Sequence, residues 1–288
     1  MRKLFGGGNK SGDNQHLLEK VPVAQDLQLP RVLEAYREDI IKARLPFAKI
    51  QAVPGDTLSI MQSSFGYYPA IPKDFIYPLD SEGNYLFPLA QIRFSEVPAL
   101  PGYPSSGFLQ FYISGIQDNY GLNIKDRRSQ KDFRIHFFEE EELTDPVTDF
   151  SFLQLDDRAR YNVPIDVPHA LSFSLQHEYM GRMDLRFAKE WAFYSAFSQQ
   201  HPEIRLQLES ELREMFKASG HKIGGYATFR QWDPRDEKDD TNDYVLLLQI
   251  DTDDRIMWGD SGIGSFFIHP ADLQKKDFSR VLYHWDSH

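Results

Sequence analysis

The stretch Leu89-Ala90-Gln91-Ile92 has a near copy, Leu247-Leu248-Gln249-Ile250, that lies 158 positions further along the chain (249 − 91 = 158). The same separation relates Phe65-Gly66-Tyr67-Tyr68-Pro69 to Ile223-Gly224-Gly225-Tyr226-Ala227 (223 − 65 = 158). Two motifs rarely share one separation by accident, so the pattern predicts an internal repeat. A repeat of apolar strands predicts an architecture rather than an activity, because each copy helps the other to bury its hydrophobic face.

The copies extend over residues 59–142 and 221–286, and a stretch of different character, residues 143–220, separates them. In each copy, short apolar strands follow one another without regular helices between them. This order argues against a doubly wound parallel sheet and favours antiparallel or mixed sheet with helices packed outside. We therefore predict an α+β, β-rich, internally duplicated fold whose copies pack about a pseudo-twofold axis.

Local patterns predict the remaining elements. Glycine and polar residues near the start indicate a disordered tail over residues 1–28, followed by a single domain over residues 29–288. Residues 30–44 are expected to form an amphipathic helix and residues 47–53 a strand. Helices are predicted at 183–199 and 202–218, and strands at 244–250, 264–268 and 280–285.

Composition limits the kinds of partner. The chain has 288 residues, a formal net charge of −11 and no cysteine. The negative charge repels phosphate backbones and anionic lipid, so we expect neither nucleic acid nor membrane as a partner. The missing cysteines remove disulfides and thiolate chemistry and fit a cytoplasmic protein. The sequence leaves the oligomeric state open.

An acidic cluster is the first candidate site. Asp251, Asp253 and Asp260 lie within ten residues and offer oxygen ligands of the kind that calcium or magnesium prefers. The alternative is a solvated turn in which the aspartates bind local backbone amides. The spacing lacks the glycine and the distal glutamate of an EF-hand, so the sequence does not identify a metal.

Two further groups of residues are candidates for binding. Gln91 and Gln249 occupy the same position in the two copies, where a buried amide is costly unless its hydrogen bonds are made. They either line a central cleft or bond to neighbouring loops. The second copy also concentrates aromatic residues beside arginines, which is typical both of sheet cores and of binding surfaces. This group contains Trp232, Trp258, Arg230 and Arg235.

Several motifs in order resemble the YwqG-like family of bacterial proteins. They include residues 64–72, 89–92 and 107–113 in the first copy, and residues 221–226, 246–251, 257–262 and 278–286 in the second. The resemblance implies a β-rich, roll-like fold and a family without an established biochemical activity. It brings no catalytic residues with it, and the sequence offers no cofactor motif of its own.

Two hypotheses about function follow. The first is a non-enzymatic, cytoplasmic binding protein for a protein partner, of which an immunity protein that neutralises a basic toxin is one form. The second is a metal-assisted hydrolase that uses Asp251, Asp253 and Asp260. A hydrolase requires these carboxylates to converge, whereas a binding protein leaves them dispersed beside an exposed aromatic surface.

Overall fold

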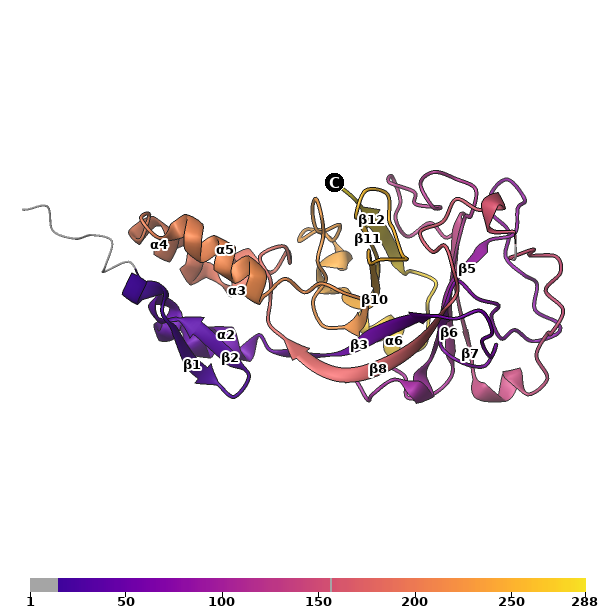
Figure 1. Ribbon diagram of the computed structural model, residues 1–288, viewed down its shortest axis with the longest axis horizontal. Coiled ribbons are helices and arrows are strands. Elements are labelled where there is room, and N and C mark those ends of the chain that lie inside the picture. Colours follow the sequence, from indigo (N-terminus) through magenta and orange to yellow (C-terminus); the bar gives the residue numbers. More distant parts are fainter. Residues whose placement is uncertain (1–14, 156) are drawn as a thin grey trace, which may run out of the picture.

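The computed structural model describes residues 15–155 and 157–288 as a β-rich body and a smaller lobe joined by a long β-ribbon (Figure 1). The body holds one ten-stranded sheet, in the order β12-β11-β10-β9-β3-β8-β4-β5-β6-β7. Its strands are β3 (Leu45–Pro54), β4 (Ser64–Phe65), β5 (Phe87–Arg93), β6 (Phe108–Ile113), β7 (Phe133–Phe138), β8 (His169–Glu178), β9 (Lys222–Gly224), β10 (Val245–Asp251), β11 (Ile263–Ile268) and β12 (Leu282–Asp286). All the pairings between them are antiparallel, which confirms the α+β, β-rich class.

The strand order is symmetric about the centre of the sheet. Read outwards from the centre, one side runs β3, β9, β10, β11, β12 and the other runs β8, β4, β5, β6, β7. The two long central strands are exchanged between the halves, because β3 pairs with β9 and β8 pairs with β4. Neither half of the chain therefore completes a sheet without the other.

Strand β8 was not predicted. It lies inside residues 143–220, which the sequence marked as a helical stretch between the copies, although helices do follow it there. Most residues in the C-terminal half of β8 are exposed. The strand therefore lacks the continuous apolar run from which β10 was predicted. The structure shows it bonded along its full length to β3, from Leu45–Glu178 to Pro54–His169.

The sheet curls so that its two halves face each other across the main core. The ring of Phe111 on β6 lies 4.8 Å from that of Phe266 on β11, and Phe133 on β7 lies 5.2 Å from Tyr283 on β12. The outer edge of β12 is covered by a loop, since the Tyr283 amide donates to the Arg127 carbonyl at 2.9 Å. Contacts from both halves thus build one core.

The lobe has a separate core, formed by the segments that precede β3 and follow β8 at one end of the ribbon. Its N-terminal part comprises β1 (Lys20–Ala24), β2 (Leu27–Pro30), the 3-10 helix η1 (Arg31–Tyr36) and α2 (Arg37–Lys42), and its later part comprises α3 (Phe187–Glu190), α4 (Ala192–Gln200) and α5 (Arg205–Met215). Leu29 and Leu33 are buried against this later part in one cluster with Trp191. Shorter elements of the body are α6 (Pro270–Gln274) and the 3-10 helices η2 (Phe94–Glu96), η3 (Glu140–Leu143), η4 (Arg158–Arg160) and η5 (Asp240–Asp243).

The structure corrects the prediction of a disordered tail over residues 1–28. Residues 20–24 form β1, and Leu18 and Leu27 are buried in the lobe. Their cluster includes Tyr179, Trp191 and Phe197, which lie more than 150 residues further along the chain, so the local sequence gave little sign of this packing. The first part of the expected tail, residues 1–14, lies outside the described residues. Within the described residues, no helix has the length and apolarity to cross a bilayer.

We predict that Gly264→Ala lowers stability by about 1–3 kcal/mol, because an added methyl group would overlap a fully buried indole. A Cβ at this position would lie 2.3 Å from the Trp258 ring. Trp258→Phe removes part of that ring, so the double variant should be more stable than the sum of the single effects implies. Urea unfolding of the four proteins measures this coupling, and simple additivity would contradict the assigned contact.

Candidate functional site

The two glutamines singled out by the sequence make matching hydrogen bonds. Gln91 accepts from the Ala70 amide at 2.8 Å and donates to the carbonyls of Ile60 and Gln62 at 2.7 and 2.9 Å. Gln249 accepts from the Thr228 amide at 3.0 Å and donates to the carbonyls of Ala218 and Gly220 at 3.1 and 2.8 Å. All three partners are displaced by the same 158 positions as the glutamines. Each amide fixes a loop to its strand, so neither lines an open cleft.

Other details of the framework match at the same displacement. A register shift lies between Pro88 and Ala90 on β5, and another between Leu246 and Leu248 on β10. The last strand of each half matches at a smaller displacement. Gln110 pairs with His136 on β7, and Ser265 pairs with His284 on β12. By this pairing, β12 is displaced from β7 by 148 positions (284 − 136 = 148). The sequence similarity of residues 131–133 to residues 276–278 corresponds instead to a displacement of 145 positions.

The halves differ where the second one carries charge. Ser64 of β4 corresponds to Lys222 of β9, which is fully buried. The Lys222 ammonium donates to both carboxylate oxygens of Glu178 at 2.8 Å and lies 5.0 Å from the centre of the Phe47 ring. Burial lowers the pKa of Lys222 and raises that of Glu178, because desolvation penalises both charges. The pair is therefore costly to bury, and its value lies in fixing the geometry.

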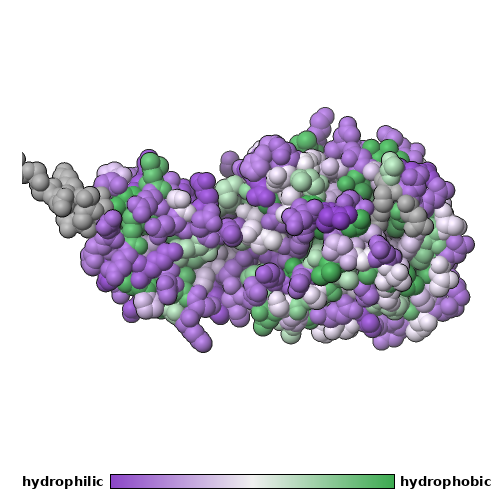
Figure 2. Space-filling view, viewed as in Figure 1, coloured by the Kyte–Doolittle hydropathy of each residue, from purple (hydrophilic) through white to green (hydrophobic). Residues whose placement is uncertain are grey.

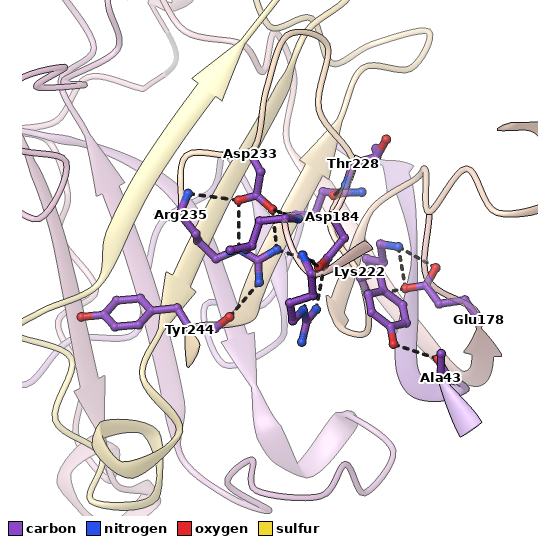
Figure 3. Close-up of polar contacts among 12 residues, drawn as sticks. Ala43, Glu178, Asp184, Lys222, Thr228, Asp233, Arg235 and Tyr244 are labelled. Carbon is purple, nitrogen blue, oxygen red and sulfur yellow. Dashed lines mark hydrogen bonds and ion pairs between the residues drawn. The ribbon is translucent and has the colours of Figure 1, made fainter. Parts of the chain in front are cut away.

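Glu178 also holds the segment that follows β9, residues 226–235, which we call the strap. Its carboxylate accepts from the Tyr226 amide at 2.6 Å, and the Tyr226 hydroxyl donates to the Ala43 carbonyl at 2.8 Å (Figure 3). The carboxylate approaches closely because residue 225 is glycine, where a Cβ would lie 2.2 Å from a Glu178 oxygen. This junction joins the ribbon, the strap and the lobe.

A second group of charges anchors the far end of the strap. The Arg235 guanidinium donates to Asp233 at 2.6 Å, to Asp184 at 3.0 Å and to the Tyr244 carbonyl at 2.9 Å (Figure 3). Arg186 adds two hydrogen bonds of 2.7 Å to Asp184, whose side chain is fully buried. Burial opposes ionisation of Asp184, but the bonds from Arg186 and the charge of Arg235 lower its pKa overall. Two carboxylates thus balance two guanidinium groups.

The acidic cluster does not converge. Asp251 is buried and accepts from the amides of Gly220 and Thr252 and from Arg230. Asp253 accepts from the amides of Arg255 and Ile256, and Asp260 is exposed. Within residues 15–155 and 157–288, no group of three His, Asp or Glu side chains is placed to hold a metal ion.

His221 lies between two of these aspartates. Its Nδ1 accepts from the Asp251 amide at 3.0 Å, so the proton is on Nε2, which faces the Asp253 carboxylate at 3.0 Å. Burial opposes ionisation of Asp253, but backbone donors and His221 lower its pKa overall. Both ring nitrogens are therefore engaged, and this arrangement leaves no free nitrogen for general base catalysis.

The remaining candidates divide between core and surface. Trp258 is fully buried in the main core, and Arg235 is buried in the ion-pair group described above. Arg230 is bound to Asp251 and donates to the Ser261 carbonyl at 2.6 Å. Trp232, in contrast, is 53% exposed on the strap. Of the four aromatic and arginine candidates, Trp232 is the one that faces solvent most openly.

Two open hollows lie away from these residues. One, of about 500 Å³, is lined by residues 82 and 116–119 of the body. The other, of about 610 Å³, lies on the lobe beside the Asp26–Arg44 ion pair and Tyr179. The molecular surface narrows between lobe and body into a mostly hydrophilic waist (Figure 2). None of the sequence-predicted site residues lines either hollow.

Sequence reasoning missed Lys222, Glu178 and Asp184. The only local signal was for Lys222, which interrupts a repeat motif at a place where its counterpart is the small residue Ser64. Its counter-ion Glu178 ends a strand that was not predicted, and Asp184 lies in a loop. Opposite charges brought together from such distant segments leave no spacing pattern in the sequence.

We predict that Lys222→Met alone destabilises the protein by about 3–5 kcal/mol, because it leaves Glu178 buried without a counter-ion. The double variant Lys222→Met/Glu178→Gln should recover most of that loss, since Gln keeps an acceptor for the Tyr226 amide. Chemical denaturation of both variants measures the difference. Equal destabilisation would show that the packing of the lysine stem matters, not the charge.

We also predict a pH effect at Asp184. Its lowered pKa in the folded protein means that it contributes stability above its unfolded pKa of about 3.9, and that this contribution is lost as the pH falls. Asp184→Asn lacks this contribution at any pH. The stability gap between wild type and the variant should therefore narrow from pH 5 to pH 2, and thermal unfolding at stepped pH measures it. A gap that stays constant would contradict the ionised state of Asp184.

Comparison with known protein families assigns most of the chain to one family. Residues 63–287 match the model of a domain of unknown function, DUF1963. The match includes both glutamines and the charged groups of the second half, and begins after β3. Among curated proteins, none matches the chain. Because the matched region covers well over half of the sequence, the chain belongs to the DUF1963 family.

Proposed function

We propose that this protein is a non-enzymatic, cytoplasmic binding protein that holds a protein partner through its strap, with Trp232 as the central contact. We further propose that it belongs with the YwqG-like bacterial proteins. The observation that carries the binding proposal is an exposed tryptophan on a segment that is tied down on both sides.

The strap is fixed at several points. The Thr228 amide donates to Gln249, and the amides of Arg230 and Gln231 donate to the Asp286 carboxylate at 3.1 and 2.7 Å. Burial opposes ionisation of Asp286, but the nearby His284 ring and these amide donors lower its pKa overall, which keeps the anchor charged. Arg235 holds the other end. A rigid aromatic residue loses little entropy on binding, and tryptophan is enriched at binding hot spots.

The charge of the chain supports a basic partner. With a net charge of −11, the protein attracts a cationic surface at long range. Two positive groups of the second half, Lys222 and Arg235, face inwards to their own carboxylates. An immunity protein that neutralises a basic toxin is the form of this function that we favour.

We also infer that the two halves arose by duplication and that the second one diverged. Support comes from the displaced copies of the glutamine bonds, from the matched register shifts and from the symmetric strand order. The shared framework keeps the roll-like body together. Lys222, Arg235 and the exposed Trp232 belong to the second half, which is where we place the site. No observation in this geometry favours the metal-assisted hydrolase.

The test compares protein capture by three forms of the purified protein: wild type, Trp232→Ala and the control Ile76→Ala. Ile76 is 89% exposed and lies in the first half, so its loss removes apolar surface without touching the strap. We expect a basic protein that wild type and the control retain, and that Trp232→Ala binds at least about tenfold more weakly. Its binding should weaken with added salt. Identical capture by all three forms would refute the role of the strap.

A further inference from the structure

A row of polar side chains crosses each half of the sheet on one face. In the first half, Ser64, Gln91, Gln110 and His136 lie directly opposite one another on successive strands. In the second half, the row consists of Lys222, Gln249, Ser265 and His284. Residues directly opposite on antiparallel strands project from the same face, so the rows can be compared position by position.

In the first half, the third position of the row is filled by an amide. Gln110 is buried, and its Nε2 donates to the Gln91 Oε1 at 2.8 Å and to the Ala70 carbonyl at 2.5 Å. Its Oε1 accepts from the Tyr112 hydroxyl at 2.5 Å. The amide group of Gln110 thus uses donors and an acceptor in a closed network, as a buried polar group requires.

In the second half, the groups that would receive this amide remain but the amide is missing. The pairing register places Ser265 where Gln110 stands and Phe267 where Tyr112 stands. Gln249 and Thr228 are the counterparts of Gln91 and Ala70, and the Gln249 Oε1 accepts from the Thr228 amide as Gln91 does from Ala70. Serine is too short to bring an amide to the place that Gln110 fills.

Two buried side chains at this place are without hydrogen-bond partners among the described residues. Ser265 is 1% exposed and its hydroxyl is unpaired, and His284 is 2% exposed with both ring nitrogens unpaired. The nearest charged group to His284 is Asp286, whose Oδ2 lies 3.7 Å from Nε2. Buried polar groups are rarely left unpaired in folded proteins, because each one costs about 1–3 kcal/mol. An unpaired serine hydroxyl beside an unpaired histidine ring therefore indicates a binding site for a ligand that forms hydrogen bonds.

We propose that the second half binds a primary carboxamide at the position that the Gln110 side chain occupies in the first half. The amide nitrogen of the ligand donates to the Gln249 Oε1 and to the Thr228 carbonyl, and its oxygen accepts from the Ser265 hydroxyl. His284 closes the site on the side of the strap, where its ring lies 6.2 Å from that of Phe229 and 6.3 Å from that of the exposed Trp232.

This inference goes beyond the proposed function, because it rests on the sheet and needs no protein partner. The same chemistry can come from a free small amide or from a glutamine side chain at the end of a peptide. The charged groups nearby bind one another, as Arg235 binds Asp184, so the site favours a neutral ligand over a carboxylate. Propionate and N,N-dimethylpropionamide, which lack the amide donors, are therefore the matched control ligands.

The test uses the full chain and follows the ring resonances of His284 by NMR, with thermal unfolding as a second readout. We expect propionamide to shift the His284 resonances and to raise the unfolding temperature, with a dissociation constant on the order of millimolar, while both control ligands do neither. The experiment is run separately with free propionamide and with a short peptide that ends in a glutamine residue. A response to the peptide alone assigns the site to a partner's side chain, and a response to both assigns it to carboxamides in general.

Two variants at Ser265 test the binding site directly. Ser265→Gln/Phe267→Tyr rebuilds the first-half network and should weaken propionamide binding at least about tenfold. If that variant fails to fold, Ser265→Ala removes only the hydroxyl and should weaken binding while Ser172→Ala, at an exposed position on β8, leaves it unchanged. An unaltered response in the variants would overturn the proposal. So would the absence of any response to the amides, together with a crystal structure that holds a single ordered water between Ser265 and His284.

Discussion

The antiparallel ladder between β3 and β8 is the constraint on which the body depends. It runs from Leu45–Glu178 to Pro54–His169, and it joins two strands that come from different halves of the chain. Because β3 pairs with β9 and β8 pairs with β4, every other strand of the sheet is attached through this ladder. The same ladder extends beyond the body and carries both parts of the lobe at its Leu45–Glu178 end (Figure 1). A fault in its register would therefore shift both halves and the lobe together.

Within this frame, buried polar groups determine where the loops lie. Gln91 and Gln249 each hold two loop segments against a strand, so the course of the loops is set by the need to satisfy an amide in the core. The second half adds ion pairs to this arrangement. Lys222 with Glu178 connects β9 to the ribbon, and Arg235 with Asp184 connects the strap to the segment that leads into the helices. Such pairs add little net stability, but they exclude alternative positions of the lobe.

The same comparison of halves underlies our proposal that the second one carries the function. At matched positions, the first half has groups that satisfy one another, such as Gln110 with Gln91. The second half replaces Gln110 with Ser265, and leaves Ser265 and His284 unpaired. If the halves arose by duplication, as we propose, such a change is tolerated because the other half continues to hold the core together. Local violation of a rule that the rest of the molecule obeys is typical of functional sites.

The sequence alone predicted the β-rich class, with antiparallel or mixed sheet, and the strands of the second half, since these follow from short-range apolar patterns. It also identified Gln91 and Gln249 as constrained residues. Only the tertiary structure decided three further features. They are the exchange of β3 and β8 between the halves, the packing of residues 18–27 into the lobe, and the pairing of Lys222 with Glu178. These features depend on contacts between segments more than 40 residues apart, such as Glu178 and Lys222, which leave no local period in the sequence. Burial then decided which candidates face solvent, placing Trp258 in the core and Trp232 on the surface.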